Sequence, residues 1–276
     1  MSDGLLEIHD SILTVAETLP PLPSSVVKLA AVVANDDSDI DDVVEVLRED
    51  PGLVTSLLSE ANSAASASAS EITTIEAALV RLGLARVLAL SCNKTIGPQA
   101  VRALQSYRLP TGALWRHSVI ASYVAEVVFR KLGGAVGPDV VTSTLLHDIG
   151  RVVLNDALDR DRLAQISRYI TVEDAEQELL GVDHAEVGKV LLDLWGLPSV
   201  ITEAVGAHHR PRYAMDDPAT VVSLASHLAN EVQPGPGAFR NEDEVDKLIT
   251  AVDIDYDEVL STSRQMLEAA GVIDPE

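Results

Sequence analysis

The sequence Leu145-Leu146-His147-Asp148-Ile149-Gly150-Arg151 places an imidazole beside a carboxylate directly after an apolar run. A histidine nitrogen and a carboxylate oxygen can both bind a divalent transition metal. Two adjacent residues form only a weak pattern, because the same pair also occurs on the surface at the end of a helix. The interpretation of this stretch therefore depends on the other histidines of the chain.

Five of the seven histidines fall at or near a predicted helix end or apolar helix face, and one of them belongs to the dyad itself. In helical bundles, inward side chains from facing helices build the metal sites. The pattern therefore indicates a site for a divalent ion such as iron, manganese or zinc, to which these five could converge: His117, His147, His184, His208 and His209. His9 lies in an amphipathic leader and His227 is expected at the surface, so neither is a candidate.

A cluster without metal is the alternative interpretation of the dyad. His147 and Asp148 would then hydrogen-bond to each other and to Arg116 or Arg151, because a buried polar cluster is stable only when its groups are satisfied. The residue pattern alone leaves both interpretations open.

The composition favours a helical protein with a large core. The chain has 276 residues, of which 47% are hydrophobic and only 3% aromatic, so the core consists mainly of Leu, Val, Ala and Ile. This length suits one large domain or two small ones. No apolar run reaches about 18 residues, so no membrane span is expected. The first residues lack a secretory signal and Cys92 is a lone, buried thiol, so we expect a cytoplasmic location.

The net charge excludes one class of partner. The chain carries 20 Lys and Arg against 43 Asp and Glu, which gives a formal charge of −23. A surface of this sign repels phosphate backbones, so nucleic acid is not an expected partner.

Periodic apolar residues and helix signals predict helices throughout the chain and no strand. Asp39 and Asp183 are predicted N-caps, and Thr73 with Glu76 forms a predicted capping box. Gly97-Pro98 is expected to break a helix. The Ala/Ser tract at 63–70 and the Pro/Gly loop at 233–237 are expected to be mobile. The predicted helices cover about 5–19, 24–34, 40–48, 52–62, 73–82, 85–95, 112–132, 139–154, 161–170, 172–180, 184–195, 198–209 and 218–231, with two more within 241–270.

Several short motifs, in this order, resemble the HDOD family, the output-domain relatives of the HD phosphohydrolases. The resemblance covers about residues 19–230 and depends on the following stretches: Leu19-Pro20-Pro21-Leu22-Pro23, Asp50-Pro51-Gly52-Leu53, Ala61-Asn62-Ser63, Ala77-Ala78-Leu79-Val80-Arg81-Leu82-Gly83, Leu114-Trp115-Arg116-His117-Ser118, the His147-Asp148 stretch, Leu180-Gly181-Val182-Asp183-His184-Ala185-Glu186-Val187-Gly188, Trp195-Gly196-Leu197-Pro198 and His208-His209.

The resemblance implies an all-α fold, a multi-helix HD-like bundle preceded by an N-terminal helical subdomain. Residues 1–106 would form the N-terminal part, 107–232 the HD-like core and 233–276 an acidic helical tail. It also implies a regulatory or protein-interaction role in bacterial signal transduction, with a protein partner in two-component or cyclic di-GMP signalling. The metal ligands of the catalytic relatives map onto His117, His147, Asp148, His184, His208 and His209.

Two departures from the catalytic pattern argue against cyclic di-GMP hydrolysis. The segment Leu224-Ala225-Ser226-His227 has Ser226 where the enzymes have a ligating Asp, and no Gly-Tyr-Pro signature follows His209. Arg151 replaces a Lys and keeps a positive charge. We therefore expect a non-catalytic module. The alternatives are a metal-dependent phosphohydrolase acting on a nucleotide-type substrate through Asp148 and Arg151, and a sensor that binds a nucleotide or metal without turnover.

Overall fold

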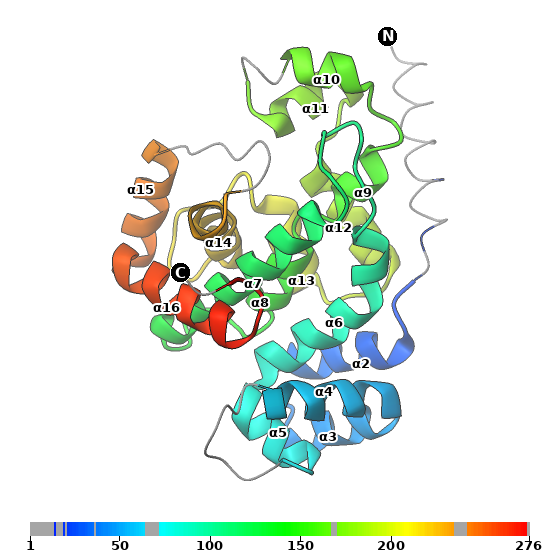
Figure 1. The fold of residues 1–276 in the computed structure, drawn as a ribbon, viewed down its shortest axis with the longest axis vertical. Helices are drawn as coiled ribbons and strands as arrows, with labels where there is room; N and C mark the ends of the chain where they lie inside the picture. Colours follow the sequence, from blue (N-terminus) through cyan, green and yellow to red (C-terminus); the bar gives the residue numbers. More distant parts are fainter. Residues whose placement is uncertain are drawn as a thin grey trace.

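The computed structural model describes residues 14, 19, 21–35, 37–63, 72–166, 170–234 and 242–274. Within these ranges every regular element is an α-helix, and one isolated antiparallel bridge joins Leu104 to Leu109 (Figure 1). The predicted all-α class is therefore confirmed. None of the helices described here is both long and apolar enough to cross a bilayer.

The first half of the chain forms a layer of helices at one end of the molecule, linked by α6 to the rest (Figure 1). These helices are α2 (Ser24–Val33), α3 (Ile40–Arg48), α4 (Pro51–Ser63), α5 (Ile75–Leu82) and α6 (Leu84–Ala100). Asp39 caps α3 as predicted, and its side chain accepts from the amides of Asp41 and Asp42. Two predictions are wrong in detail. Thr74, not Thr73, caps α5, and α6 continues through Gly97-Pro98, because an interior proline destabilises a helix without forbidding it.

The second half contains the longest helix and the helices around it. They are α7 (Ala113–Leu132), α8 (Val140–Leu146), α9 (Gly150–Leu154), α10 (Arg160–Ile166), α11 (Val172–Leu180), α12 (His184–Leu194), α13 (Ser199–Ala207) and α14 (Pro218–Val232). Asp183 caps α12 as predicted and forms a capping box with Glu186.

The single helix predicted at 139–154 is instead two helices that meet at the dyad. His147, Asp148 and Ile149 form a turn between α8 and α9. There the amide of Ile149 donates to the Leu146 carbonyl and that of Arg151 to the Asp148 carbonyl, both at 3.0 Å. These i to i−3 bonds tighten the chain as in a 3₁₀ turn. The apolar period continues through such a turn, so it could not reveal the break.

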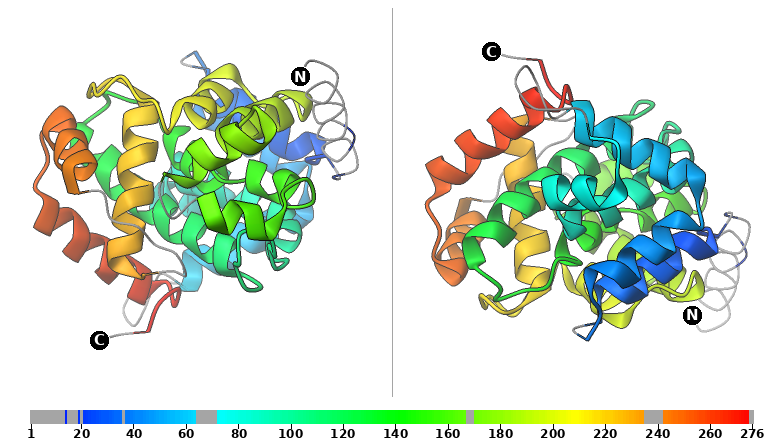
Figure 2. Two further views of the ribbon diagram at one scale, coloured as in Figure 1. Left: turned by 90° about the horizontal axis from the view of Figure 1, so that it is seen from above. Right: turned by 90° about the horizontal axis from the view of Figure 1, so that it is seen from below.

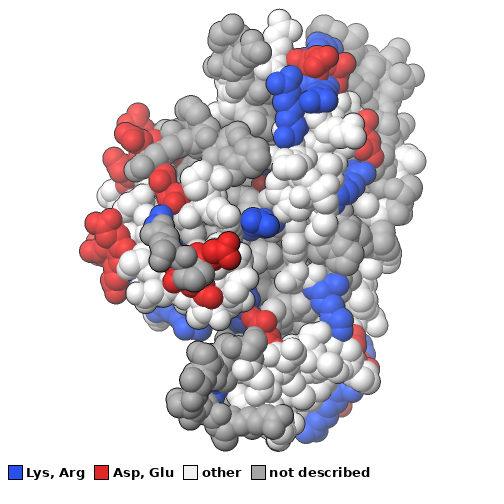
Figure 3. Space-filling model, in the orientation of Figure 1, with Lys and Arg blue, Asp and Glu red and all other residues white. Residues whose placement is uncertain are grey.

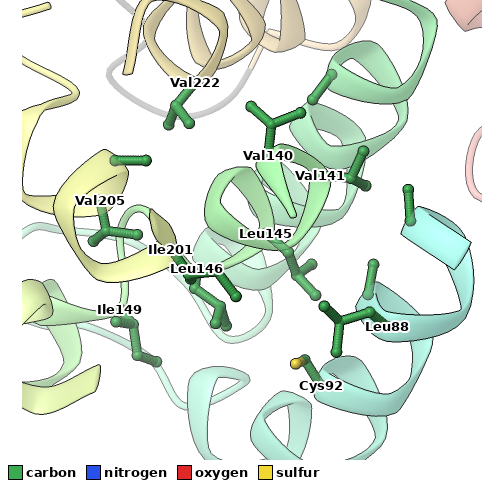
Figure 4. Packing of buried hydrophobic residues seen from close by; sticks show 14 of the residues in the cluster. Leu88, Cys92, Val140, Val141, Leu145, Leu146, Ile149, Ile201, Val205 and Val222 are labelled. Atoms are coloured by element: carbon green, nitrogen blue, oxygen red, sulfur yellow. The ribbon is translucent and has the colours of Figure 1, made fainter. Parts of the chain in front are cut away.

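The core surrounds α8, which is buried at every residue. Leu145 and Leu146 lie among side chains from α6, α13 and α14, including Cys92 and Val205 (Figure 4). Cys92 is fully buried as expected, and burial raises the pKa of its thiol to about 12. One continuous cluster of buried apolar residues includes members of both halves of the chain.

Two terminal helices, α15 (Glu242–Val252) and α16 (Tyr256–Ala269), confirm the prediction for 241–270. They lie at one side of the molecule, where α15 packs on α14 and α16 on α7 (Figure 2). Acidic side chains gather over α15 on the face shown in Figure 3, and the coloured Lys and Arg are spread in small separate groups. The expected helix at 5–19 with His9, positions 64–70 of the Ala/Ser tract and 235–237 of the loop lie outside the described residues.

Candidate metal centre

The six predicted ligands converge from two helices, α7 and α12, and from the turns that follow α8 and α13. His117 lies in α7, the His147-Asp148 pair in the turn after α8, His184 at the first position of α12, and the His208-His209 pair directly after α13. The ring centroids of His147 lie 5.4 Å from His117 and 5.1 Å from His208, and those of His208 and His184 are 5.4 Å apart. Residues more than 90 positions apart in the sequence thus share one centre.

The ligand atoms form two groups that could each hold a metal ion. One group is His117, His147 and Asp148, and the other is His184, His208 and His209. Within each group the ligand atoms all lie within 4.8 Å of one another. Imidazole nitrogens with a carboxylate oxygen suit zinc, iron or manganese, so these clusters are compatible with a divalent metal site.

Two of the histidines are held in one tautomer with Nε2 directed to the centre. The Nδ1 atom of His147 donates to the Thr144 carbonyl at 2.7 Å, and that of His208 donates to the Val205 carbonyl at 2.6 Å. Because a carbonyl only accepts, the proton is on Nδ1 and the Nε2 lone pair is exposed to the centre. Both Nε2 atoms are buried and have no hydrogen-bond partner among the residues that the structure describes. A metal ion would satisfy both, so these residues fit the ion that the sequence predicts.

Burial keeps most of these rings neutral. His147 and His208 are 1% and 2% exposed. Removal from water lowers the pKa of His117 to about 3 and holds the pKa values of His208 and His209 well below the usual range. Neutral imidazole is the form that binds metals, so no proton competes at these positions near pH 7.

Asp148 lies between the two groups and is ionised. Burial alone would raise its pKa, but the guanidinium of Arg151 and the imidazoles of His147 and His184 hold the pKa well below its usual range. Asp148 Oδ2 is 3.5 Å from His147 Nε2, and Oδ1 is 3.1 Å from His184 Nε2. Arg151 Nε lies 3.2 Å from the same Oδ1. The Arg151 contact expected for a metal-free cluster is therefore present, whereas Arg116 is exposed.

Glu176 and Tyr107 also belong to the centre, although no pattern in the sequence indicated them. Glu176 of α11 is fully buried and accepts from both the backbone amide and Nδ1 of His184, each at 2.7 Å. The Tyr107 hydroxyl donates to the other carboxylate oxygen at 2.7 Å. Burial disfavours the His184 imidazolium, but Glu176 and Asp148 raise its pKa to about 9. Tyr107 comes from the loop between α6 and α7, so no sequence spacing could have revealed this contact.

Ser226 on α14 lies where the resemblance places the missing aspartate. Its hydroxyl is 3.2 Å from Nε2 of His117. The neighbouring His227 is half-buried, so its expected surface position is wrong. The reason is that α14 packs against α7 on one side and α15 on the other, which covers this part of the helix.

Comparison with known proteins identifies the family. The model of the HDOD domain matches residues 19–211. A curated protein of Treponema pallidum (strain Nichols), named "Uncharacterized protein", is 26% identical over 259 residues, which are 92% of this chain and 50% of that protein. The chain thus spans about half the length of this relative.

Two crystal structures share the fold over nearly their whole length. An HDOD domain protein with unknown function from Geobacter sulfurreducens has a TM-score of 0.69 at 22% identity, covering 96% of this chain and 99% of its own. A "Putative phosphohydrolase" from Shewanella amazonensis SB2B has a TM-score of 0.65 at 23% identity. The match covers 95% of this chain and 96% of that protein's chain. At these identities the likeness concerns the fold alone. With the family match over residues 19–211, it confirms the resemblance read from the motifs: the chain belongs to the HDOD domain family.

Proposed function

We propose that this protein is a non-catalytic regulatory module of bacterial signal transduction, whose histidine centre binds a divalent metal and stabilises the surface offered to a protein partner. The observation that carries the proposal is the Ser226 hydroxyl beside His117 Nε2. A serine hydroxyl is a poor ligand and brings no charge, so it does not replace the aspartate of the catalytic relatives. We place the partner in two-component or cyclic di-GMP signalling and the protein in the cytoplasm.

The residues of the centre suit binding better than turnover. Asp148 and His184 are 2% and 0% exposed, so their ligand atoms are closed to a substrate arriving from solvent. The side chain of Arg151, which would have to clamp a phosphate, is directed inward to Asp148 and is only 21% exposed. A ligand that binds only the folded protein stabilises it by mass action. Iron, manganese or zinc held at this centre would therefore raise the free energy of unfolding.

A metal-dependent phosphohydrolase is the second candidate, and the retained ligand set favours it. A bound metal would act as a Lewis acid and lower the pKa of a bound water. His147 and His208 would hold the ion through Nε2, and Arg151 would bind the phosphate after turning outward. The fold of the Shewanella amazonensis neighbour, whose name includes phosphohydrolase, is compatible with this candidate.

One experiment separates the two functions. The purified wild-type protein and the variants Asp148→Ala and Ser226→Asp are loaded with manganese, iron or zinc. Their metal content is measured by elemental analysis, and hydrolysis of phosphomonoesters, phosphodiesters and cyclic di-GMP is assayed. We expect metal in the wild type, loss of metal in Asp148→Ala, and no turnover by the wild type. Metal-dependent hydrolysis that Asp148→Ala abolishes would overturn the proposal in favour of the enzyme.

A further inference from the structure

Asp148 faces both groups of ligands but is paired differently on its two sides. Its Oδ2 atom faces His147, and its Oδ1 atom faces His184 and the guanidinium of Arg151. We propose that Arg151 takes the place of a second metal ion, so that the centre holds a single divalent ion on the side of His117, His147 and Asp148. This inference rests on the proposed function, because it assumes that the centre binds metal.

The guanidinium lies at the atoms that a second ion would need. Its Nε is 3.2 Å from Asp148 Oδ1, and its Nη2 is 3.4 Å from His184 Nε2. A metal ion bound by Asp148 Oδ1 or His184 Nε2 would lie next to the positive charge of the Arg151 guanidinium. The centre is buried, and repulsion between two cations is strong where water does not screen it.

The remaining contacts also favour a metal ion on the side of His147 over the side of His184. His184 Nε2 lies 3.1 Å from Asp148 Oδ1 and 2.8 Å from His209 Nε2, so the second group is already engaged internally. Within the described residues, the histidine nitrogens of the centre that are buried without a hydrogen-bond partner belong to His147 and His208. These rings are neighbours, with centroids 5.1 Å apart, so His208 can complete the first group.

Arg151 is held in this position by its surroundings. It lies three residues after Asp148 across the tight turn into α9, which directs its side chain back over the carboxylate. On its other side the Tyr107 ring lies 5.8 Å from the guanidinium carbon. The Tyr107 hydroxyl is fixed in turn by Glu176. The folded chain therefore holds the Arg151 guanidinium beside Asp148 without any bound ligand.

The test measures metal ions per chain. The full-length wild type and the neutral variants Arg151→Gln and Arg151→Met are saturated with manganese or zinc, freed of excess metal, and measured by elemental analysis. We expect about one ion per chain in the wild type and about two in both variants, because the like charge is gone. Arg102→Gln is the matched control: it removes one charge at the Val152 carbonyl and Asp156, away from the ligands, and keeps about one ion. Circular dichroism confirms folding of each variant.

The outcomes separate this inference from the proposed function. About one ion in both Arg151 variants, or about two in the wild type, would overturn the role of Arg151 and leave the metal centre intact. No metal in any folded variant would overturn both. About two ions in both folded Arg151 variants, with about one in the wild type and Arg102→Gln, would support the inference that Arg151 replaces a second metal ion.

Discussion

Two buried polar clusters of this protein differ in whether their atoms are satisfied. The first, here called the joint cluster, consists of Glu60 on α4, Arg86 on α6 and Tyr123 on α7. Arg86 donates to Glu60 Oε1 at 3.1 Å and to the Tyr123 hydroxyl, and its guanidinium carbon lies 3.7 Å from the Tyr123 ring centroid. The second is the histidine centre, where His147 and His208 each bury an Nε2 without a partner.

This difference in hydrogen bonding indicates different roles for the joint cluster and the histidine centre. A buried polar atom without a hydrogen bond costs about 1–3 kcal/mol, so a folded protein rarely keeps one without reason. The joint cluster is complete within the chain and acts as a structural connection between the first helices and α7. The histidine centre leaves two buried nitrogens without partners among the described residues, and the proposed metal would bind them. The following variants test this contrast.

The largest effect is expected at the joint cluster. Arg86→Ala leaves Glu60 and Tyr123 without their cation in a site where the Arg86 side chain is only 10% exposed. We expect the free energy of unfolding to fall by about 3–5 kcal/mol, as for other buried ion pairs that lose one partner. Urea denaturation measures it, and the loss should be the same with and without a chelator.

Arg48→Ala is the matched control for this variant. Arg48 pairs with Glu76 at 2.9 Å, but both side chains are about half exposed or more. Exposed pairs contribute about 0–1 kcal/mol. If Arg86→Ala cost no more than Arg48→Ala, the joint cluster would not be a structural connection.

A smaller effect is expected behind the histidine centre, at Gly150. A Cβ atom there would lie 2.0 Å from the His184 carbonyl oxygen and 2.7 Å from the Gly188 amide, so α9 and α12 would have to separate. We expect Gly150→Ala to cost about 2–3 kcal/mol of stability and to lower the metal content, because the turn that carries Asp148 moves with α9. Thermal denaturation and elemental analysis measure the two effects.

Gly206→Ala controls for the added methyl group. Its Cβ would lie 2.9 Å from Cδ and 3.1 Å from Cβ of Lys189, so the three nearest atoms are all in one side chain and a small shift of Lys189 relieves the contact. We expect a change of less than about 1 kcal/mol and unchanged metal content. Equal losses in the two variants would argue against a special close approach at Gly150.

The smallest effect is expected at Glu176, which fixes the ring of His184. The Nε2 atom of His184 lies 3.1 Å from Asp148 Oδ1, so Glu176 orients a partner of a proposed ligand, and such outer partners typically contribute about 10–100-fold to metal affinity. We therefore expect Glu176→Gln to weaken metal binding by about 10–100-fold, measured by competition with a chromogenic chelator. Glu173→Gln on the same helix is the control. Glu173 lies 3.6 Å from His209 Nδ1 and is partly exposed, so its loss should matter less. Equal affinities in both variants and the wild type would leave Glu176 without a positioning role.

Much of the fold and of the candidate site was predictable from the sequence, because the signals are local. Asp39 and Asp183 cap α3 and α12 as predicted, since a cap depends on residues within one turn. The dyad and the other ligand histidines fall at helix ends or apolar faces that the periodicity reveals, and the structure brings them together. The break at the dyad was not predictable, because both sides of the turn keep the same apolar period.

By itself, the sequence determined an all-helical chain, the positions of most helices, and the residue types and motifs of an HDOD protein with Ser226 in place of an aspartate. Only the tertiary structure decided which buried atoms find partners. It directs Arg151 inward to Asp148, brings Tyr107 and Glu176 to His184, and leaves His147 and His208 each with an open nitrogen. The physical reason is that caps and periodicity act within a few residues, whereas the satisfaction of a buried polar atom depends on which helices pack face to face.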